Sequence, residues 1–263
     1  MSSEVFEPVE WIDGDYSRGL LLICDHASNC LPERYGDLGL GAVEFERHIA
    51  YDIGARPVTE ALAARLGVPA VLSTFSRLLI DPNRGEDDPT LVMRLSDGTV
   101  IPGNHPISAE EIEYRLNNFY RPYHRAVEEA IDRALATGTV PAIFSVHSFT
   151  DNWKGFRRHW DVGLLWDNDP RFTRPMIDEL EAVGGLIVGD NEPYSGALRN
   201  DTMFRHGTLR GLAHTLIEIR QDLIGTPAGI KRWVDLLTPM LEKINGLAEL
   251  HKVHHFGSRS GPL

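Results

Sequence analysis

Three chemically active side chains follow short apolar runs in this sequence. His26 lies directly after the apolar run 19–24, His147 directly after 141–146, and Glu218 near the end of a third run. Two imidazoles and a carboxylate are typical of a mononuclear zinc hydrolase, in which one coordination position stays open for water. A carboxylate outside the ligand set can accept the proton of that water. The three residues are therefore candidates for a metal-dependent hydrolytic site.

The alternative for both histidines is a structural role, with each ring hydrogen-bonded near the surface. For a single histidine the two interpretations are balanced. Two histidines and a glutamate at the ends of apolar runs favour the metal site. The metal-site hypothesis can be tested by geometry. An ion that lies ~2.1 Å from a nitrogen of each ring requires the rings of His26 and His147 to be within about 6 Å of one another.

A fourth segment, 76–84, has Arg77 and Arg84 on either side of an apolar turn and an Asp-Pro-Asn step. The planar guanidinium group can bind a carboxylate through two hydrogen bonds, and Asn83 adds a neutral donor and acceptor. Such a cluster can hold an acidic substrate, and one arginine can face a developing oxyanion. Taken alone, the segment is better explained as a surface salt-bridge network in which Asp81 pairs with an arginine.

Apolar runs of strand length alternate with amphipathic segments of helical period along the chain. This alternation predicts an α/β fold with a mostly parallel sheet and helices on both faces. In such a sheet, ligands bind beyond the carboxyl ends of the strands, where the candidate side chains stand. We expect strands at 19–24, 68–73, 141–146, 161–166, 185–188 and 211–219, and helices over 47–66, 108–136, 169–183 and 227–250.

The domain organisation is expected to be simple. No linker divides the chain, so residues 1–263 should form a single domain, with a polar, Gly-rich tail at 251–263 that frays. The segment 81–106 is rich in Gly, Pro, Asp and Asn and is too long for a plain connection. It is predicted to be a functional loop or an insertion.

The composition excludes several classes of protein. Of the 263 residues, 42% are hydrophobic and 24% are charged, which excludes a disordered or fibrous chain. The net charge of −12 argues against nucleic acid as a partner. No run approaches the ~18 apolar residues of a membrane span, and residues 1–8 lack the pattern of a secretory signal. Two cysteines, Cys24 and Cys30, are too few for a disulfide framework, so we expect a cytoplasmic protein without a membrane partner.

Five segments spread over residues 21–224 form a further pattern. They are Leu-Leu-Ile-Cys-Asp-His-Ala-Ser-Asn (21–29), His-Ile-Ala-Tyr-Asp-Ile-Gly-Ala (48–55), Ser-Arg-Leu-Leu-Ile-Asp-Pro-Asn-Arg (76–84), Ser-Val-His-Ser-Phe (145–149) and Ile-Glu-Ile-Arg-Gln-Asp-Leu-Ile (217–224). In this order they resemble the N-formylglutamate amidohydrolase family. The resemblance implies a three-layer α/β/α fold of the zinc-carboxypeptidase type (phosphorylase/hydrolase-like). It also implies hydrolysis of a small acidic N-acyl amino acid such as N-formylglutamate, which fits histidine degradation.

The resemblance implies one zinc ion per chain, held by His26 and His147. The wider carboxypeptidase pattern has His-x-x-Glu at the first metal site, whereas this chain has Asn29 at the corresponding position. Because an amide oxygen is a poorer zinc ligand than a carboxylate, either Asn29 ligates weakly or Asp52 completes the site. The alternative for Asp52 is an exposed or capping role. Asp25 is a candidate partner that orients a histidine.

The resemblance also assigns roles around the substrate. Arg77 matches the arginine that polarises the scissile carbonyl, and Glu218 matches the glutamate that activates water. Asn83 and Arg84 match the pair that holds the carboxylate of the substrate. Each assignment transfers a family role to one residue of this chain.

Further polar residues are candidate substrate contacts. His206 and Arg220 are expected to bind substrate, and Tyr194 lies in a Pro/Gly-rich loop that can close over a site. The neighbouring Arg157 and Arg158 either add positive potential near the pocket or form a solvated face.

Two rival functions stay open on the sequence. The first is hydrolysis of another N-acyl amino acid or carboxypeptidase-like cleavage of a peptide. The second is a non-catalytic protein that captures a small dicarboxylate with its arginines and needs neither zinc nor Glu218. Beside these rivals, a regulatory relative with a damaged metal site is a third possibility, and Asn29 is the residue that keeps it open.

Overall fold

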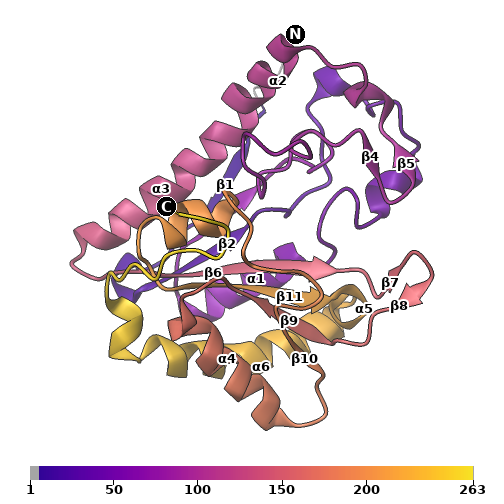
Figure 1. The fold of residues 1–263 in the computed structure, drawn as a ribbon. Coiled ribbons are helices and arrows are strands. Elements are labelled where there is room, and N and C mark those ends of the chain that lie inside the picture. The colour runs from indigo at the N-terminus through magenta and orange to yellow at the C-terminus, as the bar shows by residue number, and fades with distance from the viewer. Residues whose placement is uncertain (1–5, 263) are drawn as a thin grey trace.

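The structure is a computed structural model that describes residues 6–262. Residues 1–5, which belong to the N-terminal segment expected to lack a secretory signal, and Leu263 of the tail lie outside the described residues. The centre of the molecule is a seven-stranded sheet with the strand order β1-β3-β2-β6-β11-β9-β10 (Figure 1). Within residues 6–262, no helix has both the length and the apolar character needed to cross a bilayer.

The sheet is mixed and mostly parallel. Strands β3, β2, β6 and β11 run parallel to one another, whereas β1 pairs antiparallel with β3 and β9 pairs antiparallel with β11. The predicted α/β fold is thereby confirmed. The strands are β1 Val9–Ile12, β2 Leu20–Cys24, β3 Ala70–Ser73, β6 Ala142–Phe149, β9 Val162–Leu165, β10 Val188–Asp190 and β11 His214–Arg220.

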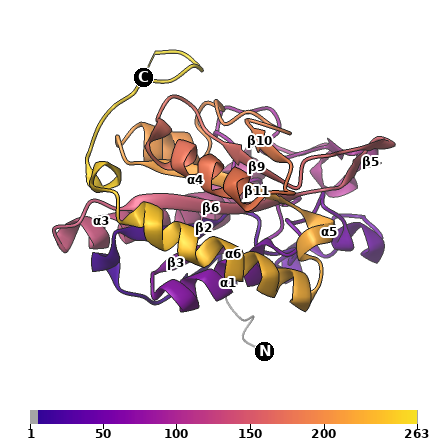
Figure 2. The same ribbon diagram turned by 90° about the horizontal axis from the view of Figure 1, so that it is seen from below.

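Helices cover both faces of the sheet. Helices α1, α4 and α6 pack on one face, which Figure 2 shows, and α3 packs on the other with α2 leading into it. Alternate residues of β2 enter the two cores: Leu20 and Leu22 face α1 and α6, whereas Leu21 and Ile23 face α3. The helices are α1 Ala55–Leu66, α2 Ala109–Arg115, α3 Arg121–Ala136, α4 Pro170–Val183, α5 Gln221–Ile224 and α6 Pro227–Asn245.

Several helix ends lie where the sequence signals predict. The Ser108 hydroxyl accepts a hydrogen bond from the Glu111 N–H and begins α2. A π-helical turn, Leu116–Tyr120, joins α2 to α3 directly before Pro122, so the predicted helix over 108–136 forms with one irregular turn. Helix α6 ends at Asn245, short of the expected 250.

The predicted helix over 47–66 is wrong in its first two turns. Helix α1 begins only at Ala55, after Gly54, which adopts a left-handed conformation with φ of 83°. Residues 47–54 are irregular, and the backbone N–H of Asp52 donates to the carbonyl of His26. The apolar spacing that suggested a helix instead buries Ile49 beneath the loops and turns Asp52 towards the end of β2.

Two small hairpins, each a separate two-stranded sheet, lie at the right of Figure 1. The first, β4 Leu95–Ser96 with β5 Thr99–Val100, lies inside the segment 81–106. The second, β7 Asn152–Trp153 with β8 Phe156–Arg157, follows β6. The sequence analysis identified neither hairpin, because each strand has only two residues and no apolar run.

The C-terminal residues cross the surface near β11 and α4. The His254 N–H donates to the carbonyl of Gly211, and the guanidinium of Arg259 pairs with Asp167.

Gly163 lets a loop cross β9 at close range. A Cβ atom at this position would lie 1.9 Å from the carbonyl oxygen of Glu192. Gly163 pairs with Glu218 of β11 in the sheet, and the crossing loop leads to Tyr194. The absence of a side chain at position 163 therefore brings residues 192–196 close to the strand pair.

We predict that Gly163→Ala lowers the free energy of unfolding by about 2–3 kcal/mol, because the new methyl group displaces backbone rather than a flexible side chain. Urea denaturation measures the change. Gly41→Ala is the matched control, since position 41 has φ of −75° and no atom within 4 Å of an added Cβ. Equal unfolding midpoints for the two variants would contradict the proposed close approach.

Candidate metal-binding and active site

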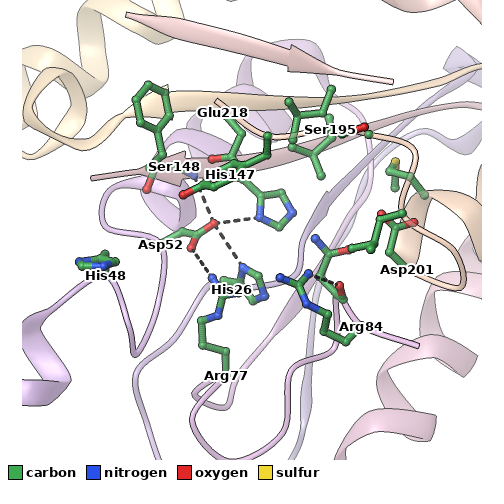
Figure 3. Close-up of a pocket in the computed structure, with 18 of the residues that line it drawn as sticks. His26, His48, Asp52, Arg77, Arg84, His147, Ser148, Ser195, Asp201 and Glu218 are labelled. Carbon is green, nitrogen blue, oxygen red and sulfur yellow. Dashed lines mark hydrogen bonds and ion pairs between the residues drawn. The ribbon is translucent and has the colours of Figure 1, made fainter. Parts of the chain in front are cut away.

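A cavity of about 280 Å³ lies beyond the carboxyl ends of β2, β6 and β11. Figure 3 shows the side chains that line it. Much of its wall is apolar and includes Met93, Trp153, Leu165 and Leu216. A concave, largely apolar site with a few convergent polar groups is typical of a small-molecule binding site.

Three buried side chains converge in this cavity. The Asp52 Oδ2 atom lies 2.8 Å from His147 Nδ1 and 3.3 Å from His26 Nδ1. The two imidazole rings are 4.9 Å apart between centroids, which satisfies the 6 Å demand derived from the sequence. One ligand atom of each residue lies within 4.8 Å of the others, so the three could hold a metal ion. Of the two residues that the sequence left open, Asn29 and Asp52, the structure brings Asp52 beside the histidines.

The outer nitrogen of each imidazole bonds to a second carboxylate. His26 Nε2 lies 2.7 Å from Asp81 Oδ1, and His147 Nε2 lies 2.9 Å from Asp25 Oδ2. A carboxylate behind a metal-binding histidine fixes the ring and its tautomer. The expectation that Asp25 orients a histidine agrees with this geometry, and Asp81 has the same relation to the other ring.

The buried charges around the histidines are unbalanced. Asp25, Asp52 and Asp81 are at most 3% exposed, and Arg77 contacts two of them, at 2.7 Å from Asp81 and 3.5 Å from Asp52. Burial acts against a charged imidazole, but hydrogen bonds to two carboxylates raise the pKa of His147 well above its usual value. The remaining negative charge can be balanced by protons on the imidazoles or by a metal cation. The donor set and its charge therefore fit a divalent cation.

Glu218 stands beside this cluster as an unpartnered carboxyl. It pairs in the sheet with His147 of β6, so the two side chains share one face, and it is 7% exposed. Within residues 6–262, its Oε2 atom has no hydrogen-bond partner. Burial raises the pKa of Glu218 to about 7. A carboxyl that titrates near neutrality in a cavity is suited to accept and return a proton.

The predicted arginine segment lies against the same cavity. Arg77, Asn83 and Arg84 all line it. The sequence suggested a surface salt bridge between Asp81 and an arginine. Asp81 instead is fully buried and pairs with the partly buried Arg77, whose Nε atom has no partner among the described residues. Arg84 donates to the carbonyl of Asn83 and forms no ion pair within residues 6–262. Arg84 therefore has hydrogen-bond donors to offer to an anion.

Three expected site residues lie outside the cavity, which corrects the predicted site. The Asn29 amide donates to the carbonyl of Phe45 instead of facing the histidines. His206 is fully buried against His124, with 2.9 Å between their nitrogens. In both cases the residue type was predicted but the direction of the side chain was not.

Arg220 is the third of these residues. Its guanidinium pairs with Asp161 at 3.0 Å and with Asp222 at 2.7 Å, so it is saturated by local carboxylates. Side chains alternate between the two faces of a strand, so Arg220 was expected on the same face as Glu218. Because Arg220 is the last residue of β11, its guanidinium instead pairs with carboxylates outside the strand.

Asp201 lines the cavity, although the sequence did not predict this. Asp201 is 4% exposed and accepts a hydrogen bond from the Phe204 N–H. Figure 3 shows it on the same side of the cavity as Arg84. Burial raises the pKa of Asp201 to about 7. No local pattern marks this residue, because it comes to the cavity through a loop between β10 and β11.

The sequence model of the N-formylglutamate amidohydrolase family matches residues 18–225, which include every cavity residue named above. The chain belongs to the N-formylglutamate amidohydrolase family. Members of this family are hydrolases that act on an amide, and the predicted membership is confirmed.

Individual relatives agree with this family. An N-formylglutamate deformylase of Pseudomonas putida is 24% identical over 202 residues, which are 71% of this chain and 73% of the relative. The crystal structure of a gene product of Agrobacterium tumefaciens is 32% identical with a TM-score of 0.85, and the match covers 91% of this chain and 95% of that one. A structure of N-formylglutamate amidohydrolase from Ralstonia eutropha shares the fold, with a TM-score of 0.62, 24% identity, and coverage of 90% and 97%.

The raised pKa of Asp201 predicts a pH-dependent stability. An unfolded aspartate loses its proton near pH ~3.9, whereas folded Asp201 keeps it to about pH 7. The folded state therefore binds more protons between these values, and this contribution to stability is complete below pH ~3.9 and lost as the pH rises through 7. The loss is on the order of 4 kcal/mol by linkage.

Asp201→Asn should remove that loss while keeping the acceptor for the Phe204 N–H. Thermal unfolding between pH 5 and pH 8 should show the melting temperature of the wild type falling relative to that of the variant. Asp178→Asn, an exposed position in α4, controls for the loss of one charge. Parallel curves for wild type and Asp201→Asn would show that Asp201 is ionised throughout.

Proposed function

We propose that this protein is a zinc-dependent amidohydrolase that removes the acyl group from an N-acyl amino acid, with N-formylglutamate as the substrate. The observation that supports this most directly is the convergence of His26, Asp52 and His147 beside the unpartnered carboxyl of Glu218. The family and the names of its relatives supply the substrate. The products are formate and glutamate.

His26, Asp52 and His147 are the residues that would hold the zinc ion. Bound zinc would polarise the amide carbonyl and make a water molecule more acidic. The chain prepares the site by fixing the outer nitrogens of both imidazoles on Asp25 and Asp81, so that their Nδ1 atoms point at one place.

Glu218 would move the proton during hydrolysis. Its pKa of about 7 leaves a substantial fraction ionised at neutral pH, so it can accept a proton from the attacking water. The water oxygen bonds to the acyl carbon, the carbon–nitrogen bond breaks, and Glu218 returns the proton to the leaving amine. The Arg77 guanidinium, whose Nε atom lacks a partner among residues 6–262, would stabilise the oxyanion.

Asn83 and Arg84 would hold the carboxylate of the amino acid. Arg84 forms no ion pair within the described residues, so binding a carboxylate does not require it to leave another partner. A bidentate guanidinium–carboxylate pair fixes orientation as well as position. The substrate would then lie between Arg84 and the two histidines.

We predict that Glu218→Gln lowers kcat for N-formylglutamate by about 10²–10⁴-fold with little change in KM, because an amide keeps the shape but cannot accept the proton. The wild-type kcat/KM should fall as the pH drops below about 7, where Glu218 is protonated. Steady-state kinetics over pH 5–9 measure both effects. Glu192→Gln, an exposed position on the neighbouring loop, is the control.

Unchanged turnover in Glu218→Gln would remove Glu218 from the reaction. Substrate binding without turnover in the wild type would instead favour the non-catalytic dicarboxylate-binding protein. A panel of N-formyl, N-acetyl and N-succinyl amino acids with a dipeptide separates the remaining hydrolase alternatives.

Metal content tests the proposal independently of activity. Elemental analysis of the purified protein should give about one zinc per chain, and removal of the metal by a chelator should abolish hydrolysis until zinc is restored. Asp81→Asn should weaken zinc binding by about 10–100-fold, because it loosens the hold on His26. Asp97→Asn, whose carboxylate contacts Arg47 rather than a candidate ligand, should bind zinc like the wild type. Full activity of the metal-free protein would contradict the zinc mechanism.

A further inference from the structure

Arg158 follows the β7–β8 hairpin and lies against residues that line the cavity. One of its nitrogens, Nη1, donates to the Tyr194 hydroxyl at 2.7 Å. Its guanidinium carbon lies 5.6 Å from the ring centroid of Phe149, 5.4 Å from that of Trp153 and 4.8 Å from that of Tyr194. All three aromatic residues line the cavity. Arg158 is therefore held against the cavity wall by rings and not by a carboxylate.

Among the described residues, Arg158 shares the lack of an ion pair with Arg84 and differs in this respect from Arg77 and Arg220. Arg77 is compensated by Asp81 and Asp52, and Arg220 by Asp161 and Asp222. Within residues 6–262, Arg158 forms no ion pair with an acidic side chain. Contacts with aromatic rings leave the charge of the guanidinium uncompensated, so its remaining N–H groups can bind an anion.

The charge of Arg158 acts on the same cavity as that of Arg77. Burial lowers the pKa of His48, a cavity residue, and the positive charges of Arg77 and Arg158 add to this effect. The guanidinium of Arg158 also bonds to the hydroxyl of Tyr194, a second cavity residue. The positive charge of Arg158 therefore acts on residues that line the cavity.

This inference rests on the proposed function. N-formylglutamate has two carboxylates, and Arg84 with Asn83 accounts for one of them. Arg77 is already compensated, so the second carboxylate needs another cation. We propose that Arg158 binds the side-chain carboxylate of a dicarboxylic N-acyl amino acid and determines the preference of the enzyme for such substrates. Tyr194 is the positioning residue that aims the Arg158 guanidinium.

The test compares N-formyl-L-glutamate with its neutral isostere N-formyl-L-glutamine. The zinc-loaded wild type should prefer the glutamate compound through a lower KM. In Arg158→Gln, KM for N-formylglutamate should rise about tenfold with kcat unchanged, whereas KM for N-formylglutamine should stay the same. Arg158→Lys should recover part of the preference. Arg157→Gln, at the exposed neighbouring position, should behave as the wild type.

Several results would overturn the assignment. An equal rise of KM for both compounds in Arg158→Gln would show that Arg158 only shapes the cavity wall. A wild type that does not distinguish the two compounds, or an equal effect of Arg157→Gln, would exclude a specific carboxylate contact.

Titration calorimetry separates this inference from the proposed function. If the wild type hydrolyses neither compound, the proposed function fails, and binding decides the role of Arg158. Tighter binding of N-formylglutamate that Arg158→Gln weakens would support the carboxylate site. Binding that does not depend on Arg158, or no binding at all, would refute it.

Discussion

The Asp52 carboxylate lies between two imidazoles, and the other polar groups of the site are arranged around this contact. The Nδ1 atoms of His26 and His147 both face Asp52, so their Nε2 atoms point away from it. These Nε2 atoms bond to Asp81 and Asp25, respectively. Each of these carboxylates is itself bonded further, Asp25 to Tyr123 and Asp81 to Arg77. The position of a single carboxylate thus fixes the orientation of several buried side chains.

Burial gives neighbouring carboxyl groups different properties. Hydrogen bonds and the histidine charges outweigh burial and hold the pKa of Asp52 below its usual value. Glu218 lacks such partners among the described residues, so burial dominates and raises its pKa. Two carboxyl groups in one cavity therefore suit different tasks, one to stay ionised and one to exchange protons. The proposed roles of ligand and proton carrier follow this division.

The sequence predicts what depends on local pattern and on strand order. Continuous apolar runs predicted the buried strands, and the rule that ligands bind at their carboxyl ends predicted the meeting of His26, His147 and Glu218. The sequence does not predict the direction of a side chain that lies on irregular backbone. Asp52 lies before α1 in irregular backbone that turns its side chain towards the histidines. The Asn29 side chain donates to the carbonyl of Phe45 instead. Asp201 depends on the path of a long loop, which no local pattern specifies.

The close crossing over Gly163 has a consequence for how this family can diversify. The strand that faces Glu218 must stay without a side chain there, whereas the loop above it contributes Tyr194 and Leu198 to the cavity wall. Substitutions in this loop can therefore change the shape of the cavity wall without a change in the strands that carry His147 and Glu218. The wall can be remodelled separately from the polar groups at its base.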